Sequence, residues 1–184
     1  DIMQSMYDKG YVLISLHKIA KMETQPDGTV QIVQQPIYLP RGKKPFVLSE
    51  DDVCYYEYMT GTGFATKLCL DENGKVVNEY VERDGSVSYG SYDVLTVLED
   101  FIETHPDFSY QGSKGILAFT GYDGILGYRT SDFWYNENCD YYVSTPANDK
   151  EKREDHTSPN ENIEQDKQTA REVAQAIRDL GWEL

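Results

Sequence analysis

Residues 45–52 read Pro45-Phe46-Val47-Leu48-Ser49-Glu50-Asp51-Asp52, an apolar run that passes directly into three acidic residues. Apolar residues without alternation are typical of a strand buried on both faces, as in a parallel sheet. Tyr11–Leu16 and Gly115–Thr120 have the same character. We therefore predict three buried strands. The strand at 45–49 is the most informative of them, because its apolar run ends directly at the acidic residues.

Two helical patterns lie between and after these strands. Ser91–Thr104 carries a broad apolar stripe, and Ser91 is placed to cap that helix at its amino end. Ile163–Leu180 repeats apolar residues on one face and precedes Gly181, a residue type that commonly ends helices. Strands that alternate with helices predict an α/β fold with a parallel sheet, either an open sheet or part of a barrel.

Three segments read as additions to this framework. Glycine-containing turns predict an antiparallel hairpin insertion over residues 65–90. A second, peripheral hairpin is expected to pair residues 29–33 with residues 37–39. Residues 136–166 are polar and charged, and they predict a long exposed loop. With these additions, we expect residues 1–184 to belong to a single domain.

Composition restricts the function. The chain has 184 residues with 17 Lys+Arg and 32 Asp+Glu, a formal net charge of −15. Clustered basic residues are needed to bind phosphate backbones or anionic lipids, so nucleic acid and anionic membrane surfaces are disfavoured as partners. No apolar run approaches the length of a transmembrane helix. The 15 tyrosines favour a surface that is both apolar and hydrogen-bonding, such as a sugar site.

Polar side chains follow the predicted strands, and the carboxyl ends of parallel strands meet at one edge of a sheet. His17 follows the first strand, and Asp51 and Asp52 follow the second. Two adjacent carboxylates repel each other, so a functional pair needs a shifted pKa or a cation such as a divalent metal. The alternative for the aspartates is a solvated turn, and the alternative for His17 is a hydrogen-bonded residue at a strand end.

The Gly- and Tyr-rich loop after the third strand offers contacts to a substrate. Tyr122 and Tyr128 could form an aromatic platform for a sugar ring, and the alternative is a pair of packed tyrosines. Arg129 could bind an anionic group of a substrate or pair with an acidic side chain. His17, Tyr122, Tyr128 and Arg129 are therefore candidate substrate-binding residues.

The stretch from Phe46 to Asp52 resembles the first motif of the polysaccharide deacetylases, in which a strand ends in Thr-Phe-Asp-Asp-Gly. This family is also known as the nodulation-protein-B homology domain and as carbohydrate esterase family four. Residues 105–110, 114–116 and 126–129 look like a subgroup of the family from Gram-positive bacteria. The resemblance covers most of the chain but only the first half of the family's domain.

The resemblance implies a distorted (β/α) barrel that removes acetyl groups from chitin-like or peptidoglycan sugars, outside the cell or at its surface. It implies that Asp51 is the catalytic base and that Asp52 binds a divalent metal, zinc or cobalt, which activates the attacking water. The chain departs from the family where Val53 replaces a glycine and where the metal-binding His-x-x-x-His motif is absent. Residues 182–184 resemble the start of the strand that precedes this motif, so we expect an incomplete domain.

Three functions follow as hypotheses. The first is a metal-dependent deacetylase of an amino-sugar polysaccharide, to which the chain supplies part of the active site. The second is a non-catalytic carbohydrate-binding or cell-surface protein on a degenerate deacetylase scaffold. The third is a glycosidase-like hydrolase that uses Asp51 or Asp52 with another carboxylate. A polysaccharide or peptidoglycan fragment is the expected partner, and an incomplete sheet would leave strand edges through which copies could associate.

Overall fold

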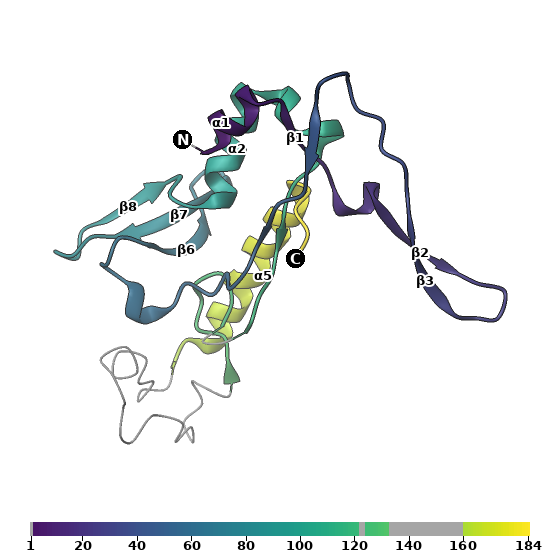
Figure 1. Cartoon of the computed structure of the whole chain (residues 1–184). Helices are drawn as coiled ribbons and strands as arrows, with labels where there is room; N and C mark the ends of the chain where they lie inside the picture. The colour runs from purple at the N-terminus through teal and green to yellow at the C-terminus, as the bar shows by residue number, and fades with distance from the viewer. Residues whose placement is uncertain (1, 122–123, 133–159) are drawn as a thin grey trace, which may run out of the picture.

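The computed structural model describes residues 2–121, 124–132 and 160–184 (Figure 1). Its α-helices are α1 (Ile2–Asp8), α2 (Val94–Thr104) and α5 (Ile163–Asp179). Its strands are β1 (Tyr11–Leu13), β2 (Ala20–Thr24), β3 (Val30–Gln34), β4 (Lys44–Phe46), β5 (Ser49–Glu50), β6 (Ala65–Leu70), β7 (Val76–Val81), β8 (Val87–Gly90) and β9 (Ile116–Leu117). Short 3-10 helices are η1 (Leu16–Lys18), η2 (Glu57–Met59), η3 (Pro106–Phe108) and η4 (Tyr110–Gly112). Together they form a mixed α/β structure with small parallel and antiparallel sheets.

The strands predicted to be buried run parallel to one another. β1 pairs with β4, with Leu13 opposite Phe46, and β5 then pairs with β9. Glu183 adds a further parallel bridge to Ile116. The parallel pairing is therefore confirmed, but the prediction that residues 45–49 form a strand buried on both faces is wrong. None of these residues is buried, because β4 and β5 lie in separate two-stranded sheets and their regular parts are shorter than the apolar run. Within the described ranges the strands form separate two- and three-stranded sheets and do not close into a barrel.

The antiparallel insertion forms as the turn residues predict. β6, β7 and β8 make a three-stranded antiparallel sheet within residues 65–90. In the first turn, the Asp71 carboxylate accepts hydrogen bonds from the backbone amides of Asn73 and Lys75. In the second, Asp84 accepts from the amide of Ser86. These aspartates satisfy backbone donors that the reversal of the chain would otherwise leave open.

The prediction for the peripheral hairpin is wrong in its pairing. β3 pairs with β2, which precedes it, and residues 37–39 form no strand. The Asp27 carboxylate explains this register, because it accepts hydrogen bonds from the amide and the hydroxyl of Thr29 and fixes the turn before β3. In Figure 1 this hairpin projects from the right side of the molecule, away from the helices.

The helices are placed as predicted, with one different cap. Asp93 caps α2 by accepting a hydrogen bond from the amide of Val94, whereas Ser91 donates its hydroxyl to Asp100. The cap prediction for Ser91 is therefore wrong: a carboxylate directly before the helix reaches its first amides, two residues closer than the serine. α2 ends at Thr104, with His105 as its carboxyl-terminal cap before Pro106, and α5 ends before Gly181.

One hydrophobic core joins the sheets to the helices. Helix α5 buries three residues, Ala170, Val173 and Ile177, against it, and in Figure 1 this helix lies between the antiparallel sheet and the β2–β3 hairpin. Phe108 and Trp182 are buried in the same cluster. Across the described part of the chain, no helix combines the length and the apolar character that crossing a membrane requires.

Candidate active site at the end of strand β5

Asp51 and Asp52 lie where β5 ends, and both side chains are exposed. The backbone turns sharply here, because Asp52 has φ +59°, in the left-handed region that aspartate tolerates better than most residues. The amide of Val53 still donates to the carbonyl of Ala118, so the turn remains attached to the segment that follows β9. The two carboxylates therefore stand at the carboxyl end of the parallel strands, as the sequence predicts.

A pocket of about 360 Å³ opens beside these carboxylates. We call it the aspartate pocket, and its aromatic lining residues are Tyr55, Tyr56, Phe64 and Tyr92. Sequence reasoning missed these four residues as site residues. The available signal was the pair Tyr55-Tyr56, which begins three residues after Asp52, together with Tyr92 beside the cap of α2. Aromatic walls around a small number of polar groups are typical of pockets that bind organic ligands.

Tyr56 connects the ends of two parallel strands. Burial, followed by the negative charge of Asp52, raises the pKa of the Tyr56 hydroxyl, and this hydroxyl also interacts with Thr120. The Thr120 hydroxyl lies 2.9 Å from the Sγ of Cys54. The structure thus brings Asp52 from the end of β5 together with Thr120 from beyond the end of β9.

A hydrogen-bond network supports the inner wall of the aspartate pocket. Tyr55 donates its hydroxyl to Asp93, the residue that caps α2. The side-chain amide of Asn78 donates to the same hydroxyl over 3.4 Å, and its oxygen accepts from the amide of Tyr92 (3.1 Å) and the hydroxyl of Thr96 (2.6 Å). Asn78 is fully buried, so this network joins β7, α2 and the pocket wall.

Among the three acidic residues Glu50, Asp51 and Asp52, Glu50 is the one that is partly buried. Its Oε2 atom is buried and has no hydrogen-bond partner within the described residues. Burial, followed by the charge and hydrogen bond of Asp93, raises the pKa of Glu50 to about 8. At neutral pH we therefore expect Glu50 to be protonated and to share its proton with Asp93.

Replacing Glu50 by glutamine should remove a pH-dependent loss of stability. The pKa of Glu50 is higher in the folded protein than its ordinary value of 4.5, so the folded state binds the extra proton and loses stability as pH rises from 4.5 to about 8. Partial exposure reduces the effect to about 1–2 kcal/mol. Urea unfolding of both proteins at pH 5, 7 and 9 measures it. A stability difference between them that does not change with pH would contradict the assignment.

The other predicted site residues are spread over the molecule. His17 is exposed, and its Nε2 lies 2.9 Å from Oε2 of Glu183. Tyr128 is only 8% exposed and belongs to the core, with the ammonium of Lys67 5.8 Å from its ring centre. Tyr122 lies outside the described residues. Neither His17 nor Tyr128 lines the aspartate pocket, so their roles in substrate binding stay predictions.

Arg129 does not line the aspartate pocket but is hydrogen-bonded to Tyr55, which does. Its guanidinium donates to the carbonyl of Tyr55 at 2.7 Å. Both backbone polar groups of Arg129 are hydrogen-bonded. Its amide donates to the carboxylate of Asp166, and its carbonyl accepts from the side-chain amide of Asn160. Arg129 therefore links the start of α5 to the loop that carries the tyrosines of the pocket, and its role in substrate binding stays a prediction.

The described residues do not complete a metal site. Asp51 and Asp52 offer two carboxylates, but residues 2–121, 124–132 and 160–184 contain no group of three or more His, Cys, Asp or Glu side chains that could hold a metal ion. A closed zinc site uses four ligands, and a catalytic one uses three protein ligands. The side chains of the described part thus do not by themselves fit zinc or cobalt.

Comparisons with known proteins found no relative of this chain. No family model, no curated protein and no solved structure matches the chain. The resemblance to the polysaccharide deacetylases therefore stays an expectation from the sequence motif alone.

Proposed function

We propose that the aspartate pocket binds an N-acetylated amino sugar of a polysaccharide or peptidoglycan fragment, and that the protein takes part in removing its acetyl group. The observation that carries this proposal is the pair Asp51-Asp52 at the carboxyl end of a parallel strand, opening onto a pocket with aromatic walls. In this proposal the parallel strands are the front part of a distorted (β/α) barrel, and the protein acts outside the cell or at its surface.

The lining of the pocket suits a sugar. The faces of Phe64 and of the tyrosines can stack on the C–H face of a sugar ring, while tyrosine hydroxyls and carboxylates accept or donate hydrogen bonds at its edge. The formal charge of −15 disfavours polyanions. A neutral N-acetylated sugar, or the cationic amine left after deacetylation, meets no such repulsion.

In this proposal Asp51 is the general base. Its exposed carboxylate can take a proton from the water that attacks the acetyl carbonyl, and the protonated carboxyl can return that proton to the amine when the C–N bond breaks. Acetate and a free amino sugar are the products. A zinc or cobalt ion would increase the acidity of such a water, and binding it would require ligands beyond the described residues in addition to Asp52.

Removing the ring of Phe64 tests the sugar-binding part of this proposal. Phe64 is 54% exposed, so Phe64→Ala should leave the fold intact. We expect this variant to bind chitotetraose about tenfold more weakly than the wild type, because one aromatic–sugar contact is lost. Isothermal titration calorimetry measures the two affinities. Tyr38→Ala is the matched control, since Tyr38 is 81% exposed and does not line the pocket. Equal affinities of Phe64→Ala and the wild type would refute the placement of the sugar site in the aspartate pocket.

The alternative function is carbohydrate binding without catalysis. The specific observation that favours it is the incomplete set of metal ligands in the described residues. Both functions use the same pocket, and they differ in whether acetate is released from the bound sugar.

A further inference from the structure

The wall of the aspartate pocket continues onto the face of the antiparallel sheet through Tyr92. Tyr92 lines the pocket, and its ring centre lies 5.2 Å from the ring centre of Tyr80 in β7, with the two ring planes inclined at 46°. Tyr80 itself does not line the pocket. The two rings therefore form an aromatic surface that begins inside the aspartate pocket and ends outside it. We call this surface the tyrosine platform.

Tyr92 is fixed in place although it is 47% exposed. Its amide donates to the side-chain oxygen of Asn78 over 3.1 Å, and its hydroxyl donates to the hydroxyl of Ser88 over 3.1 Å. Gly90 lies against the ring, since a Cβ atom added there would be 3.2 Å from it. An aromatic ring that is held at both ends and is open to solvent is preorganised, which lowers the entropic cost of binding a ligand.

The alternative for the tyrosine platform is a purely structural pair of rings. Tyr128 shows what a packed tyrosine of this protein looks like, because it is only 8% exposed and belongs to the hydrophobic core. Neither Tyr80 nor Tyr92 belongs to that core. Their ring spacing is close to the length of one sugar unit in a linear polysaccharide, so successive units can stack on the two rings.

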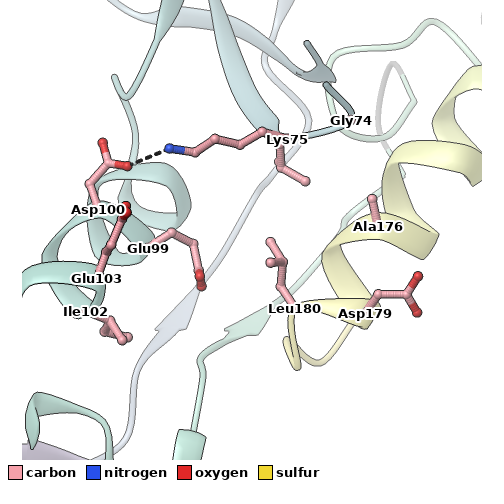
Figure 2. A pocket seen from close by; sticks show the side chains of 10 residues that line it. Gly74, Lys75, Glu99, Asp100, Ile102, Glu103, Ala176, Asp179 and Leu180 are labelled. Carbon is pink, nitrogen blue, oxygen red and sulfur yellow. Dashed lines mark hydrogen bonds and ion pairs between the residues drawn. The ribbon is translucent and has the colours of Figure 1, made fainter. Parts of the chain in front are cut away.

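A second pocket, of about 540 Å³, offers no such surface (Figure 2). It lies between the β6–β7 turn, α2 and the last turn of α5, and Figure 2 shows Ile102, Ala176 and Leu180 in its lining. None of the described residues that line it is aromatic, and none also lines the aspartate pocket. A sugar chain that extends from the aspartate pocket would therefore stack on the tyrosine platform and not here.

We propose that the tyrosine platform is a second sugar-binding subsite, so that the protein recognises a chain of amino sugars rather than a single unit; this inference rests on the proposed function. One unit occupies the aspartate pocket, the next stacks on Tyr92, and a further unit stacks on Tyr80. Ser88 lies opposite Tyr80 on the same face of the sheet, and it can donate its hydroxyl to a sugar hydroxyl at the edge of the platform.

Chain length tests this subsite. We expect calorimetry to show that the wild type binds chitotetraose about tenfold more tightly than chitobiose, because only the longer sugar reaches Tyr80. Tyr80→Ala should weaken chitotetraose binding about fivefold and change chitobiose binding less than about twofold. Phe64→Ala should weaken the binding of both sugars, because Phe64 lines the aspartate pocket.

Tyr89→Ala is the matched control. Tyr89 follows Ser88 in β8, is 61% exposed, and lies on the opposite face of the sheet, where its hydroxyl donates to Glu79. Its removal should change the affinity for either sugar less than about twofold. The NMR signals of the Tyr80 ring in the wild type give a measurement that needs no variant, and they should shift with chitotetraose but not with chitobiose.

The outcomes separate the subsite from the proposed function. The subsite is refuted if chitotetraose shifts the ring signals of Phe64 but not those of Tyr80, or if Tyr80→Ala binds chitotetraose as tightly as Tyr89→Ala does. In both cases the aspartate pocket stands without the platform. A wild type that binds neither sugar would instead overturn the proposed function, and this inference with it.

Discussion

Replacing Gly127 by alanine is expected to destabilise the protein by about 3–5 kcal/mol, one of the largest effects that a single methyl group can cause. Gly127 has φ +90°, and a Cβ atom there would lie 2.2 Å from Cβ of Lys67 and 2.4 Å from the carbonyl oxygen of Thr66. Both neighbours belong to β6, and one is backbone, so they cannot move aside without disturbing the sheet.

This destabilisation would affect the aspartate pocket, because the loop at Gly127 connects the turn after Asp52 to β6 through hydrogen bonds. The amide of Leu126 donates to the carbonyl of Val53, directly after Asp52. The carbonyl of Leu126 accepts from the amide of Leu68 in β6. A loop pushed away from β6 would lose both contacts and release the turn that holds Asp51 and Asp52.

Gly28 supplies the matched control for this prediction. It has φ +84°, and no heavy atom would lie within 4 Å of an added Cβ. Gly28→Ala should therefore cost only the backbone strain, about 1–2 kcal/mol. Urea unfolding followed by circular dichroism measures both variants. If Gly127→Ala and Gly28→Ala lower the free energy of unfolding equally, the close packing of the 124–129 loop against β6 is contradicted.

Replacing Asp51 by asparagine is expected to lower acetate release from chitotetraose at least about 100-fold, the usual contribution of a general base. Asparagine keeps the size of the side chain but cannot accept a proton from water at neutral pH. The assay supplies zinc or cobalt to the purified chain and measures acetate enzymatically.

Sugar binding is the control for this loss of activity. Asp51→Asn should bind chitotetraose within about threefold of the wild type, because the substitution keeps the size of an exposed side chain. Undiminished acetate release by Asp51→Asn would contradict its role as base. A wild type that binds the sugar but releases no acetate would overturn catalysis in favour of the binding function.

The sequence predicted the parallel pairing because continuous apolar runs mark such strands and are visible without a structure. It was wrong about the burial of residues 45–49, because the number of strands in each sheet depends on tertiary pairing that the run itself does not show. It also predicted the sheet at 65–90, where Asp71 and Asp84 mark the turns through local hydrogen bonds. The hairpin β2–β3 was harder, since residues 20–24 are mixed in polarity and pair through backbone hydrogen bonds that leave little trace in the side chains.

The candidate site was predictable only in part. Asp51 and Asp52 follow an apolar run, so their position at a strand end could be read from local order. The walls could not be read in this way, because Phe64 and Tyr92 reach the pocket from loops that lie far apart in the sequence. The burial of Tyr128 depends on how the 124–129 loop packs on β6 and α5, a tertiary contact that a Gly- and Tyr-rich segment does not reveal.

The central claim is that the aspartate pocket recognises an N-acetylated amino sugar. The most direct test is a titration of the purified protein with chitotetraose and, in parallel, with cellotetraose, which lacks the acetamido groups. We expect chitotetraose to bind at least about tenfold more tightly and to shift the NMR signals of Asp51, Tyr56 and Phe64. Equal binding of the two sugars, or chemical shift changes confined to other parts of the protein, would contradict the claim.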